Sequence, residues 1–409
     1  MTGNRDFDLV VWGATGFTGR LVAEYLFGRY GAGGDLRWAM GGRSESKLEQ
    51  VRAGLGEGAE KVPILVGDSH DPASLQAIVT RARVVCSTVG PFARYGSELV
   101  AACARHGTHY CDITGEVQWM RRMIDAHEGT ARESGARIVH ACGFDSIPSD
   151  LGCLFVHDAM RQAHGHPCEE VKLRVRRAKG GFSGGTAASM LNALEEALGD
   201  RDVRRVLGNP YSLNPDGERS GPDGPDQRGA AWDPDVDSWT APFVMAAVNT
   251  RVVRRSNALS GYAYGREFRY GEAVMTGRGP AGWARAVGLT AGLGGFMTIA
   301  SMSPGRALLR RLALPKPGEG PSREKRESGF FDLLLVGKGG GAEVRARVRG
   351  DRDPGYGATS KMLGESAVCL ARDAGDLRVA GGFWTPASSM GSRLIDRLRD
   401  NAGMSFDLV

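Results

Sequence analysis

The sequence lacks several features that would assign it to a class of protein at once. Its seven cysteines include no Cys-x-x-Cys pair and no signal peptide precedes them, so we expect reduced thiols and a cytoplasmic location. No block of five basic residues occurs and the net charge is only +5, so nucleic acid is not an expected partner. No histidine follows His166, which argues against a hydrolase with its nucleophile in the Gly-x-Ser-x-Gly stretch at 181–185.

Metal-ligand spacing and long hydrophobic runs are also scarce. Cys103, His106, His109 and Cys111 lie close in sequence but span a helix end, a turn and a strand, so we expect no metal site. The longest apolar stretch, Val287–Met302, is shorter than the roughly 20 residues that cross a bilayer. We interpret it as a buried helix, with peripheral contact to a membrane surface as the alternative.

The first 150 residues alternate between strand and helix patterns. Short apolar runs predict strands, and apolar residues spaced i, i+4 between them predict helices. This alternation is typical of an α/β protein with a Rossmann-type, doubly wound parallel sheet, which we expect as a domain over residues 1–150. The expected strands include Phe7–Trp12, Leu36–Met40, Val62–Val66, Val84–Val89 and Ala136–His140.

A glycine-rich loop follows the first expected strand and opens the first expected helix. Gly13 allows a tight turn, Gly16 allows a pyrophosphate to approach the backbone, and Gly19 allows the helix to pack closely on the strand. Free amide groups and the helix dipole at this point favour an anion. The loop therefore predicts a dinucleotide site, and its residues are Gly13, Thr15, Gly16, Phe17, Thr18 and Gly19.

The ends of the next strands indicate which dinucleotide is bound. The second strand ends at Arg43, with Ser44 and Lys47 close behind and no acidic residue to bind a ribose 2′-hydroxyl. Because guanidinium and ammonium groups suit a 2′-phosphate, the sequence favours NADP(H) over NAD(H). The strands that follow contribute further candidate cofactor contacts, at Asp68 and Ser69 on the adenine side and at Val89, Gly90 and Pro91 on the nicotinamide side.

Residues 151–355 show a different pattern, which predicts a second, α+β domain with a mainly antiparallel sheet. Alternating residues predict strands at Glu170–Arg177, Phe331–Val336 and Glu343–Arg349, and one more through Tyr262, Tyr264, Phe268 and Tyr270. Residues 208–242 contain six prolines and five glycines and predict a long loop, either a docking lid or a mobile connection.

Seven blocks distributed along the chain carry a resemblance to known proteins: Val11–Gly19, Thr88–Gly96, Tyr110–Glu116, His140–Asp150, Ser183–Thr186, Gly318–Ser322 and Gly382–Ala387. Together they resemble the saccharopine dehydrogenase-like oxidoreductases, and within them the trans-acting enoyl reductases of actinobacteria. The resemblance covers almost the whole chain and implies a nicotinamide-dependent reductase that acts on a carbon–carbon double bond of a polyketide or lipid intermediate. The substrate would be a hydrophobic acyl chain, free or bound to a carrier. The resemblance also implies that the C-terminal segment, residues 356–409, returns to the first domain.

Reduction of an enoyl thioester needs a proton donor near the carboxyl ends of the parallel strands. Tyr95 and Asp145 are the leading candidates for catalytic residues, although Tyr95 could simply pack and Asp145 could cap a helix. Asp112, Glu116 and His140 also follow strands in this region. Two other functions stay open: a dehydrogenase of an amino-acid-like imine or carbonyl, and a cofactor-binding, membrane-associated module without turnover.

Overall fold

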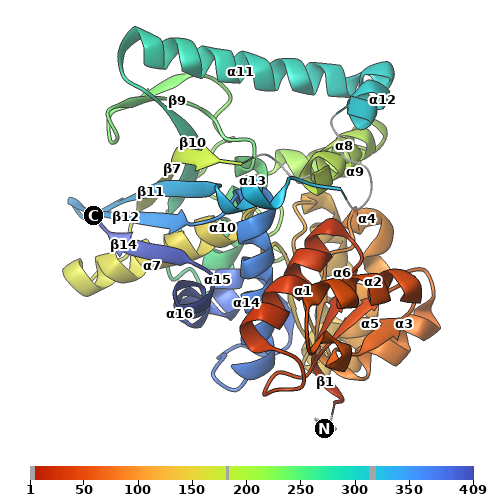
Figure 1. Cartoon of the computed structure of the whole chain (residues 1–409). Helices are drawn as coiled ribbons and strands as arrows, with labels where there is room; N and C mark the ends of the chain where they lie inside the picture. The colour runs from red at the N-terminus through yellow and green to blue at the C-terminus, as the bar shows by residue number, and fades with distance from the viewer. Residues whose placement is uncertain (1–4, 181–183, 313–318) are drawn as a thin grey trace.

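The computed structural model describes residues 5–180, 184–312 and 319–409. These residues form two seven-stranded sheets with helices between and around them (Figure 1). The α/β class and the pairing of a parallel sheet with a second, mostly antiparallel sheet, both predicted from the sequence, are confirmed. The stretch at 181–183, which holds the serine of the Gly-x-Ser-x-Gly pattern, lies outside the described residues.

The first sheet is wholly parallel among its described pairs and has the order β13-β6-β5-β4-β1-β2-β3. The chain leaves β1 in one direction and returns beside it with β4, so the switch point lies between these two strands. A crevice at the carboxyl ends is where ligands bind in such sheets. The strands are β1 (Phe7–Trp12), β2 (Trp38–Gly42), β3 (Ile64–Val66), β4 (Ala82–Ser87), β5 (His109–Asp112), β6 (Arg137–Val139) and β13 (Gly382–Trp384).

Helices cover both faces of this sheet, as the alternating pattern predicts. Ser44 and Asp71 cap the second and third of them through their side chains, because each accepts a hydrogen bond from a first-turn amide. The helices are α1 (Phe17–Tyr30), α2 (Glu45–Leu55), α3 (Pro72–Val79), the short α4 (Phe92–Tyr95), α5 (Ser97–His106) and α6 (Val117–Ser134).

The second sheet has the order β14-β12-β11-β7-β10-β9-β8, and β7 and β10 are its one parallel pair in the described chain. Its strands alternate inward apolar residues with outward charged ones, which is why the sequence shows period two. They are β7 (Glu170–Lys179), β8 (Ala231–Asp233), β9 (Ser238–Pro242), β10 (Arg269–Gly277), β11 (Phe330–Gly339), β12 (Ala342–Gly350) and β14 (Met404–Leu408).

One expected strand is wrong in its extent. The aromatic run from Tyr262 does not continue a strand, because β10 begins at Arg269 and Tyr262 has a left-handed backbone at φ 59°. The aromatic residues still form core: the ring of Tyr264 stacks on His157 at 3.9 Å, and both are buried. The rings of Tyr264 and Phe268 pack against His157 of the helix α7 (Ile147–His164).

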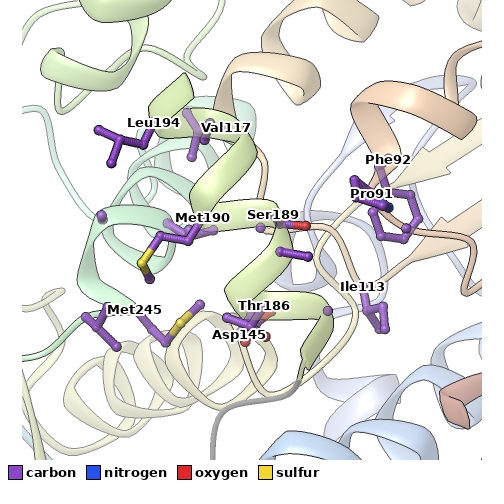
Figure 2. A pocket seen from close by; sticks show the side chains of 18 of the residues that line it. Pro91, Phe92, Ile113, Val117, Asp145, Thr186, Ser189, Met190, Leu194 and Met245 are labelled. Atoms are coloured by element: carbon purple, nitrogen blue, oxygen red, sulfur yellow. The ribbon is translucent and has the colours of Figure 1, made fainter. Parts of the chain in front are cut away.

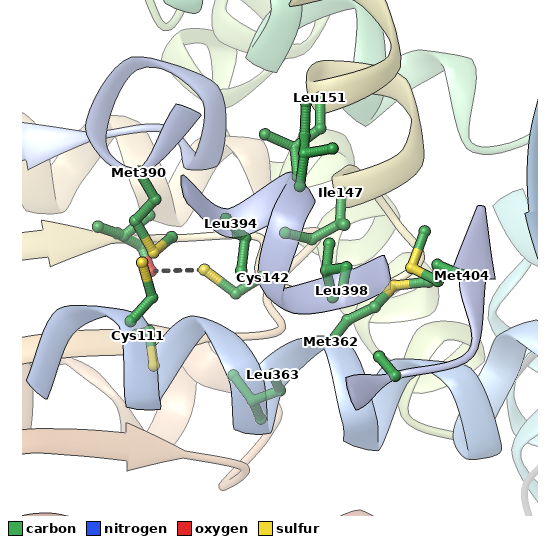
Figure 3. Packing of buried hydrophobic residues seen from close by; sticks show 14 of the residues in the cluster. Cys111, Cys142, Ile147, Leu151, Met362, Leu363, Met390, Leu394, Leu398 and Met404 are labelled. Atoms are coloured by element: carbon green, nitrogen blue, oxygen red, sulfur yellow. Dashed lines mark hydrogen bonds between the residues drawn. The ribbon is translucent and has the colours of Figure 1, made fainter. Parts of the chain in front are cut away.

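The two sheets share one hydrophobic core. The helix α14 (Thr359–Arg372) packs on β1, β4 and β5, and α16 (Gly391–Asn401) joins it to α7 under the second sheet. Figure 3 shows Met362 on the side of α14 that faces Leu398 and Ile147, and Leu363 on the opposite side of this helix. The C-terminal part of the chain serves both sheets, since β13 pairs with β6 and β14 pairs with β12. The exact domain boundaries stay a prediction.

Residues 208–242 are not the structureless loop that their proline and glycine content suggests. The segment carries β8 and β9 and buries Tyr211, Leu213 and Asn214. Buried arginines of α10 (Ala246–Leu259) satisfy its carbonyl groups: Arg255 donates to Leu213 and Arg254 donates to Pro210. The segment has little helix or strand periodicity of its own, and hydrogen bonds from neighbouring helices hold its backbone in place instead.

A second correction concerns the apolar stretch at 287–302. It does form a helix, α11 (Gly279–Ser301), but that helix is not buried: Gly282, Ala286 and Ala300 are its only buried members. The helix crosses the top of the molecule in Figure 1 and turns into α12 (Ser303–Leu312). Apolar composition predicted burial, yet little of the described chain covers this helix.

Candidate active site

The glycine loop has the geometry of a nucleotide cradle. Gly13 has φ +90°, and a side chain there would meet Val89 at 2.6 Å. A Cβ at Gly19 would come within 2.1 Å of the Gly13 carbonyl oxygen, so the helix and the loop touch backbone to backbone. These two positions require glycine for different reasons, one for its conformation and one for its lack of volume.

The N-terminus of α1 is open to an anion. Its N-cap, Gly16, offers no side-chain cap, and no acidic residue lies in the first turn. The first-turn amides of Phe17, Thr18 and Gly19 have no partner within the helix and carry the positive end of its dipole. The residues present therefore fit the pyrophosphate of a dinucleotide.

Thr88 joins this loop to the end of β4. Its hydroxyl lies 3.2 Å from both the Trp12 and the Gly13 carbonyl oxygens, so it fixes the turn at the switch point. Val89, Gly90 and Pro91 follow it and lie partly exposed beside the glycine loop, with a cis peptide bond between Gly90 and Pro91.

The backbone and the ring of Phe17 have different roles in the predicted loop. Its amide belongs to the open helix terminus, but its ring meets Tyr356 edge to face at 4.8 Å and lies under the guanidinium of Arg326. The ring therefore packs on the segments that flank the second sheet, and its backbone is the part that faces an anion.

The basic residues after β2 are exposed. Arg43 and Lys47 project into solvent, and no ion pair engages either of them in the described parts of the chain. Ser44 caps α2 by accepting a hydrogen bond from the Lys47 amide at 3.4 Å. Two free cations and a hydroxyl thus stand where the 2′ position of an adenosine ribose lies in this fold.

The residues after β3 are held by local bonds. The Asp68 carboxylate accepts a hydrogen bond from the His70 amide at 2.8 Å. Ser69 is buried and accepts the indole hydrogen of Trp12 at 3.1 Å. Of this predicted pair, Asp68 keeps a partly exposed carboxylate, whereas the Ser69 hydroxyl is committed to the wall of the sheet.

A cavity of about 380 Å³ begins beside Thr88 and Gly90, which follow β4. Thr18, Thr88 and Gly90 line one end of it, and the rest of the lining is mainly apolar, with the polar side chains of Gln118, Asp145, Thr186, Ser189 and Thr359 among it. Figure 2 shows Met190, Leu194 and Met245 lining it from α8 (Gly184–Gly199) and from the start of α10. The cavity therefore connects the open helix terminus of α1 with a pocket suited to a hydrocarbon chain.

Asp145 is the one ionisable side chain among the described residues that line this cavity. Burial raises the pKa of its carboxyl to about 7, and no hydrogen bond or ion pair to it occurs within the described part of the chain. A Cβ built at Gly115 would lie 3.8 Å from the Oδ2 atom of Asp145, and Figure 2 shows the carboxyl close to Thr186. Near neutral pH this carboxyl holds a proton for part of the time, which suits an acid.

Gln118 is a cavity residue that the sequence did not single out. It is 2% exposed, and neither atom of its carboxamide has a hydrogen-bond partner among the described residues. An unpartnered buried amide is costly, which makes it a candidate for a ligand contact. No local pattern could reveal it, because its significance lies in the missing partner.

Tyr95, the other predicted catalytic residue, does not line the cavity. It is half-buried at the end of α4, and its ring contacts His70 at 5.4 Å. The structure thus brings Asp145, and not Tyr95, to the described cavity lining. The two leading candidates lie on different sides of the cleft because α4 turns Tyr95 toward the β3 end.

The other acids and bases considered have fixed partners. Asp112 is buried and bonds His140 at 2.8 Å and the Tyr110 hydroxyl at 3.0 Å. Glu116 accepts hydrogen bonds from the Phe92 amide and from Ser189 on α8. Asp112 therefore braces β5 against β6, and Glu116 ties the cavity wall together. Within the described residues no group of three His, Cys, Asp or Glu could hold a metal.

The nucleotide half is similar to a known domain. The model of the saccharopine dehydrogenase NADP binding domain matches residues 9–139, which run from β1 to β6. Together with the open glycine loop and the adjoining cavity, this match defines an NAD(P)-binding oxidoreductase.

Relatives extend the similarity to the whole chain. A protein of Mycobacterium tuberculosis, provisionally named a trans-acting enoyl reductase, is 47% identical and is matched over 98% of this chain and 97% of its own. The trans-acting enoyl reductase of Mycobacterium bovis is 39% identical over 96% of each chain. The chain therefore belongs to the saccharopine dehydrogenase-like oxidoreductase family, as its sequence blocks predict.

A solved structure supports the fold. Apo saccharopine dehydrogenase (L-Glu forming) from Saccharomyces cerevisiae aligns with 98% of this chain and 99% of its own, with a TM-score of 0.51 and 10% sequence identity. At that identity the likeness concerns the arrangement of the two sheets and not the chemistry.

Proposed function

We propose that the protein is an NADPH-dependent reductase of an activated carbon–carbon double bond on an apolar acyl substrate. The observation that carries the proposal is the apolar cavity of about 380 Å³ that adjoins the nicotinamide end of the cleft and has one carboxyl in its wall. The names of the relatives agree with this reaction.

The preference for NADPH follows from the end of β2. Arg43 and Lys47 are exposed and unpaired among the described residues, and Ser44 adds a hydroxyl between them. The 2′-phosphate of NADPH would form ion pairs with both cations. The 2′-hydroxyl of NADH would have no carboxylate there to accept its hydrogen bond.

The residues of the cavity divide the reaction between them. The glycine loop and the end of β2 would hold the dinucleotide, and the chemistry it would supply is hydride transfer to the β carbon of the substrate. The Gln118 amide can donate a hydrogen bond to the thioester oxygen, where negative charge develops. Asp145 then gives its proton to the α carbon, which leaves a saturated thioester and an aspartate that regains a proton from water. The methionines and leucine of α8 and α10 exclude water around the acyl chain.

The alternative substrate, an amino-acid-like imine, fits less well. Such a substrate carries a carboxylate, which needs a cation or several donors in the pocket. The described lining holds no cation, and its single charge is the acidic Asp145, which would repel a carboxylate. A carbonyl or imine reductase activity therefore stays the second candidate.

The test is reduction of defined substrates by the purified full chain. We expect NADPH oxidation with 2-enoyl thioesters, stronger for a twelve-carbon than for a four-carbon chain because the longer chain fills more of the cavity, at about 0.8 kcal/mol per buried methylene. With NADPH carrying deuterium at the transferred position, the label should appear at the β carbon of the product. Turnover of keto or imino acids alone, with enoyl thioesters left intact, would refute the proposal.

A further inference from the structure

The pair of helices α11 and α12, which we call the α11–α12 arm (Gly279–Ser301 and Ser303–Leu312), is apolar and exposed. Trp283 is 50% exposed, Leu289 52% and Ile299 46%. Seven of the twelve exposed large hydrophobic residues found in the described chain belong to the arm or to its bend: Trp283, Val287, Leu289, Met297, Ile299, Met302 and Leu308. A water-exposed helix is usually polar on its outer face. The apolar outer face of this arm is instead typical of a surface that binds another molecule or a membrane.

The charge of the arm has one sign. No aspartate or glutamate occurs between Glu272 and Glu319, a stretch that holds five arginines and one lysine. In α11 the sole charged residue is Arg285, near the start of the helix. Three arginines follow in α12: Arg306, Arg310 and Arg311. Apolar side chains with flanking cations and no acid are the composition of a helix that lies in the headgroup region of an anionic bilayer.

The shape of the arm suits a surface better than a span. Among the described residues no single helix is long and apolar enough to cross a membrane, and the arm meets that criterion only as a pair bent by 113°. In Figure 1 α11 runs along the outside of the molecule, clear of most other elements, with α12 folded down at its end. A bilayer could therefore cover the outer side of α11 without unfolding it.

The arm also reaches the cavity. Met297 of α11 is exposed, and it is at the same time one of the residues that line the cavity beside α8. The exposed apolar surface is thus continuous with the cavity wall at this residue. An acyl chain could pass from a lipid layer to the cavity along apolar side chains.

We propose that the α11–α12 arm docks the protein on an anionic lipid surface. The apolar side chains of α11 enter the headgroup region, and the arginines contact lipid phosphates. Docking does not depend on the reaction proposed above; only the delivery of an acyl substrate at Met297 rests on it.

The features of the arm favour a lipid surface over an acidic protein. A protein partner recognises a shaped groove or a patterned charge surface, but α11 presents apolar residues around most of its circumference and just one charge. A lipid layer needs no shape complementarity and can contact apolar residues on any side of the helix. Binding of an acidic carrier protein, or of a second copy of the chain, is the competing outcome of the experiment.

The experiment is flotation of the full chain with vesicles of phosphatidylcholine alone or mixed with phosphatidylglycerol. We expect binding to the mixed vesicles that weakens as salt is raised. The double variant Leu289→Gln/Ile299→Gln should bind about 100-fold more weakly, since two apolar side chains no longer enter the bilayer. Leu408→Gln, equally exposed at 57% but on β14, is the matched control and should bind like the wild type.

A spectroscopic readout places the contact on the arm. Mixed vesicles should shift the tryptophan emission of the wild type to the blue, and Trp283→Phe should lose most of that shift. Absence of binding, equal binding to neutral vesicles, or equal loss in the Leu408 control would overturn the proposal. So would self-association or carrier-protein binding that depends on Leu289 and Ile299 when no vesicle binding occurs.

The two proposals fail separately. Vesicle binding is measured without cofactor or substrate, and enoyl reduction is measured with a short, water-soluble thioester. Reduction without vesicle binding overturns the docking proposal alone, and vesicle binding without reduction of any enoyl thioester overturns the function alone.

Discussion

At the residue scale, our proposal assigns the choice between the two dinucleotides to Arg43. Its guanidinium is exposed after β2 and free of ion pairs within the described chain. We expect Arg43→Ala to weaken NADPH binding about 10- to 100-fold, the range for a lost charged hydrogen bond, and to leave NADH binding within about twofold. Titration of nicotinamide fluorescence measures both constants, and an equal loss for both dinucleotides would show that Arg43 does not meet a 2′-phosphate.

We expect Asp145 to determine how the rate of enoyl reduction depends on pH. Because burial raises the pKa of its carboxyl to about 7, the proton-donating form is present below pH 7 and disappears above it. The rate of enoyl reduction should therefore fall as pH rises through about 7. Asp145→Asn should lower kcat about 100- to 10,000-fold and remove this titration, with NADPH affinity unchanged. A variant with the wild-type pH profile would exclude Asp145 as the acid.

Gln118 is the second cavity residue with a testable role. Its amide has no partner among the described residues, so its removal should not break an internal bond. Gln118→Leu, similar in volume, is expected to lower kcat about 100-fold through loss of the donor to the thioester oxygen, and to keep or raise thermal stability. Loss of stability with kcat unchanged would instead mark Gln118 as a structural residue.

At the element scale, the close contact of α1 with the glycine loop limits what can replace Gly19. A Cβ there would lie 2.1 Å from the Gly13 carbonyl oxygen, so Gly19→Ala must push the helix from the loop. We expect NADPH and NADH binding to weaken together by at least about tenfold, and the protein to lose about 1–3 kcal/mol of stability. Isothermal titration and urea unfolding measure the two effects.

The same helix supplies the control for this substitution. Gly28 is exposed on α1, and nothing lies within 4 Å of a Cβ built there. Gly28→Ala should leave cofactor binding unchanged and raise stability by up to about 1 kcal/mol, the gain in helix propensity. If both glycine variants behaved alike, the close approach at Gly19 would not be the reason for its effect.

The elements that could be predicted from the sequence are those whose signal is local. Period-two strands and the glycine turn after β1 depend on neighbouring residues, so they were identified with near-correct bounds. The exposure of α11, the shortened strand before Arg269 and the ordered segment 208–242 depend on what lies against them in space. Composition records how apolar a segment is and not whether anything covers it.

The residues of the candidate site also separate into those with a local sequence signal and those that depend on contacts in space. The ends of β1, β2 and β4 follow from the alternation of strands and helices, so the cofactor loop could be located in advance. The cavity could not, because its walls come from α8 and α10, far along the chain, and its polar residue Gln118 is distinguished by a missing bond.

At the scale of the whole molecule, the core between the two sheets buries ionisable groups. Asp150 on α7 accepts hydrogen bonds from Ser256 on α10 and from the Ala387 amide. Glu272 on β10 accepts from the Tyr270 hydroxyl at 2.8 Å and from Asn249 at 2.9 Å. Burial outweighs these bonds and raises the pKa of both carboxyls to about 7.

These raised values fix how stability changes with pH. The folded pKa of Asp145, Asp150 and Glu272 is about 7, above the ordinary values of 3.8 and 4.5, so their stabilising contribution is complete below pH 4 and is lost as pH rises through 7. His109 and His157 act in the opposite sense, since burial lowers their pKa from 6.5 to about 4 and about 3, and they cost stability below pH 6.5. Above pH 6.5 only the carboxyls of this set still change.

We therefore expect the free energy of unfolding to fall as the pH rises from 6.5, by up to about 1.4 kcal/mol per pH unit for each proton that the folded state still holds, and to level off toward pH 8 as these carboxyls ionise. Urea unfolding across this range measures the slope. Asp150→Asn keeps much of the shape and hydrogen bonding at this junction without a titrating group, so its curve should be flatter than that of the wild type by up to one proton. A wild-type stability that stays constant or rises from pH 6.5 to 8 would show that these carboxyls are already ionised in the core. Asp145 would then hold no proton to donate in the reaction.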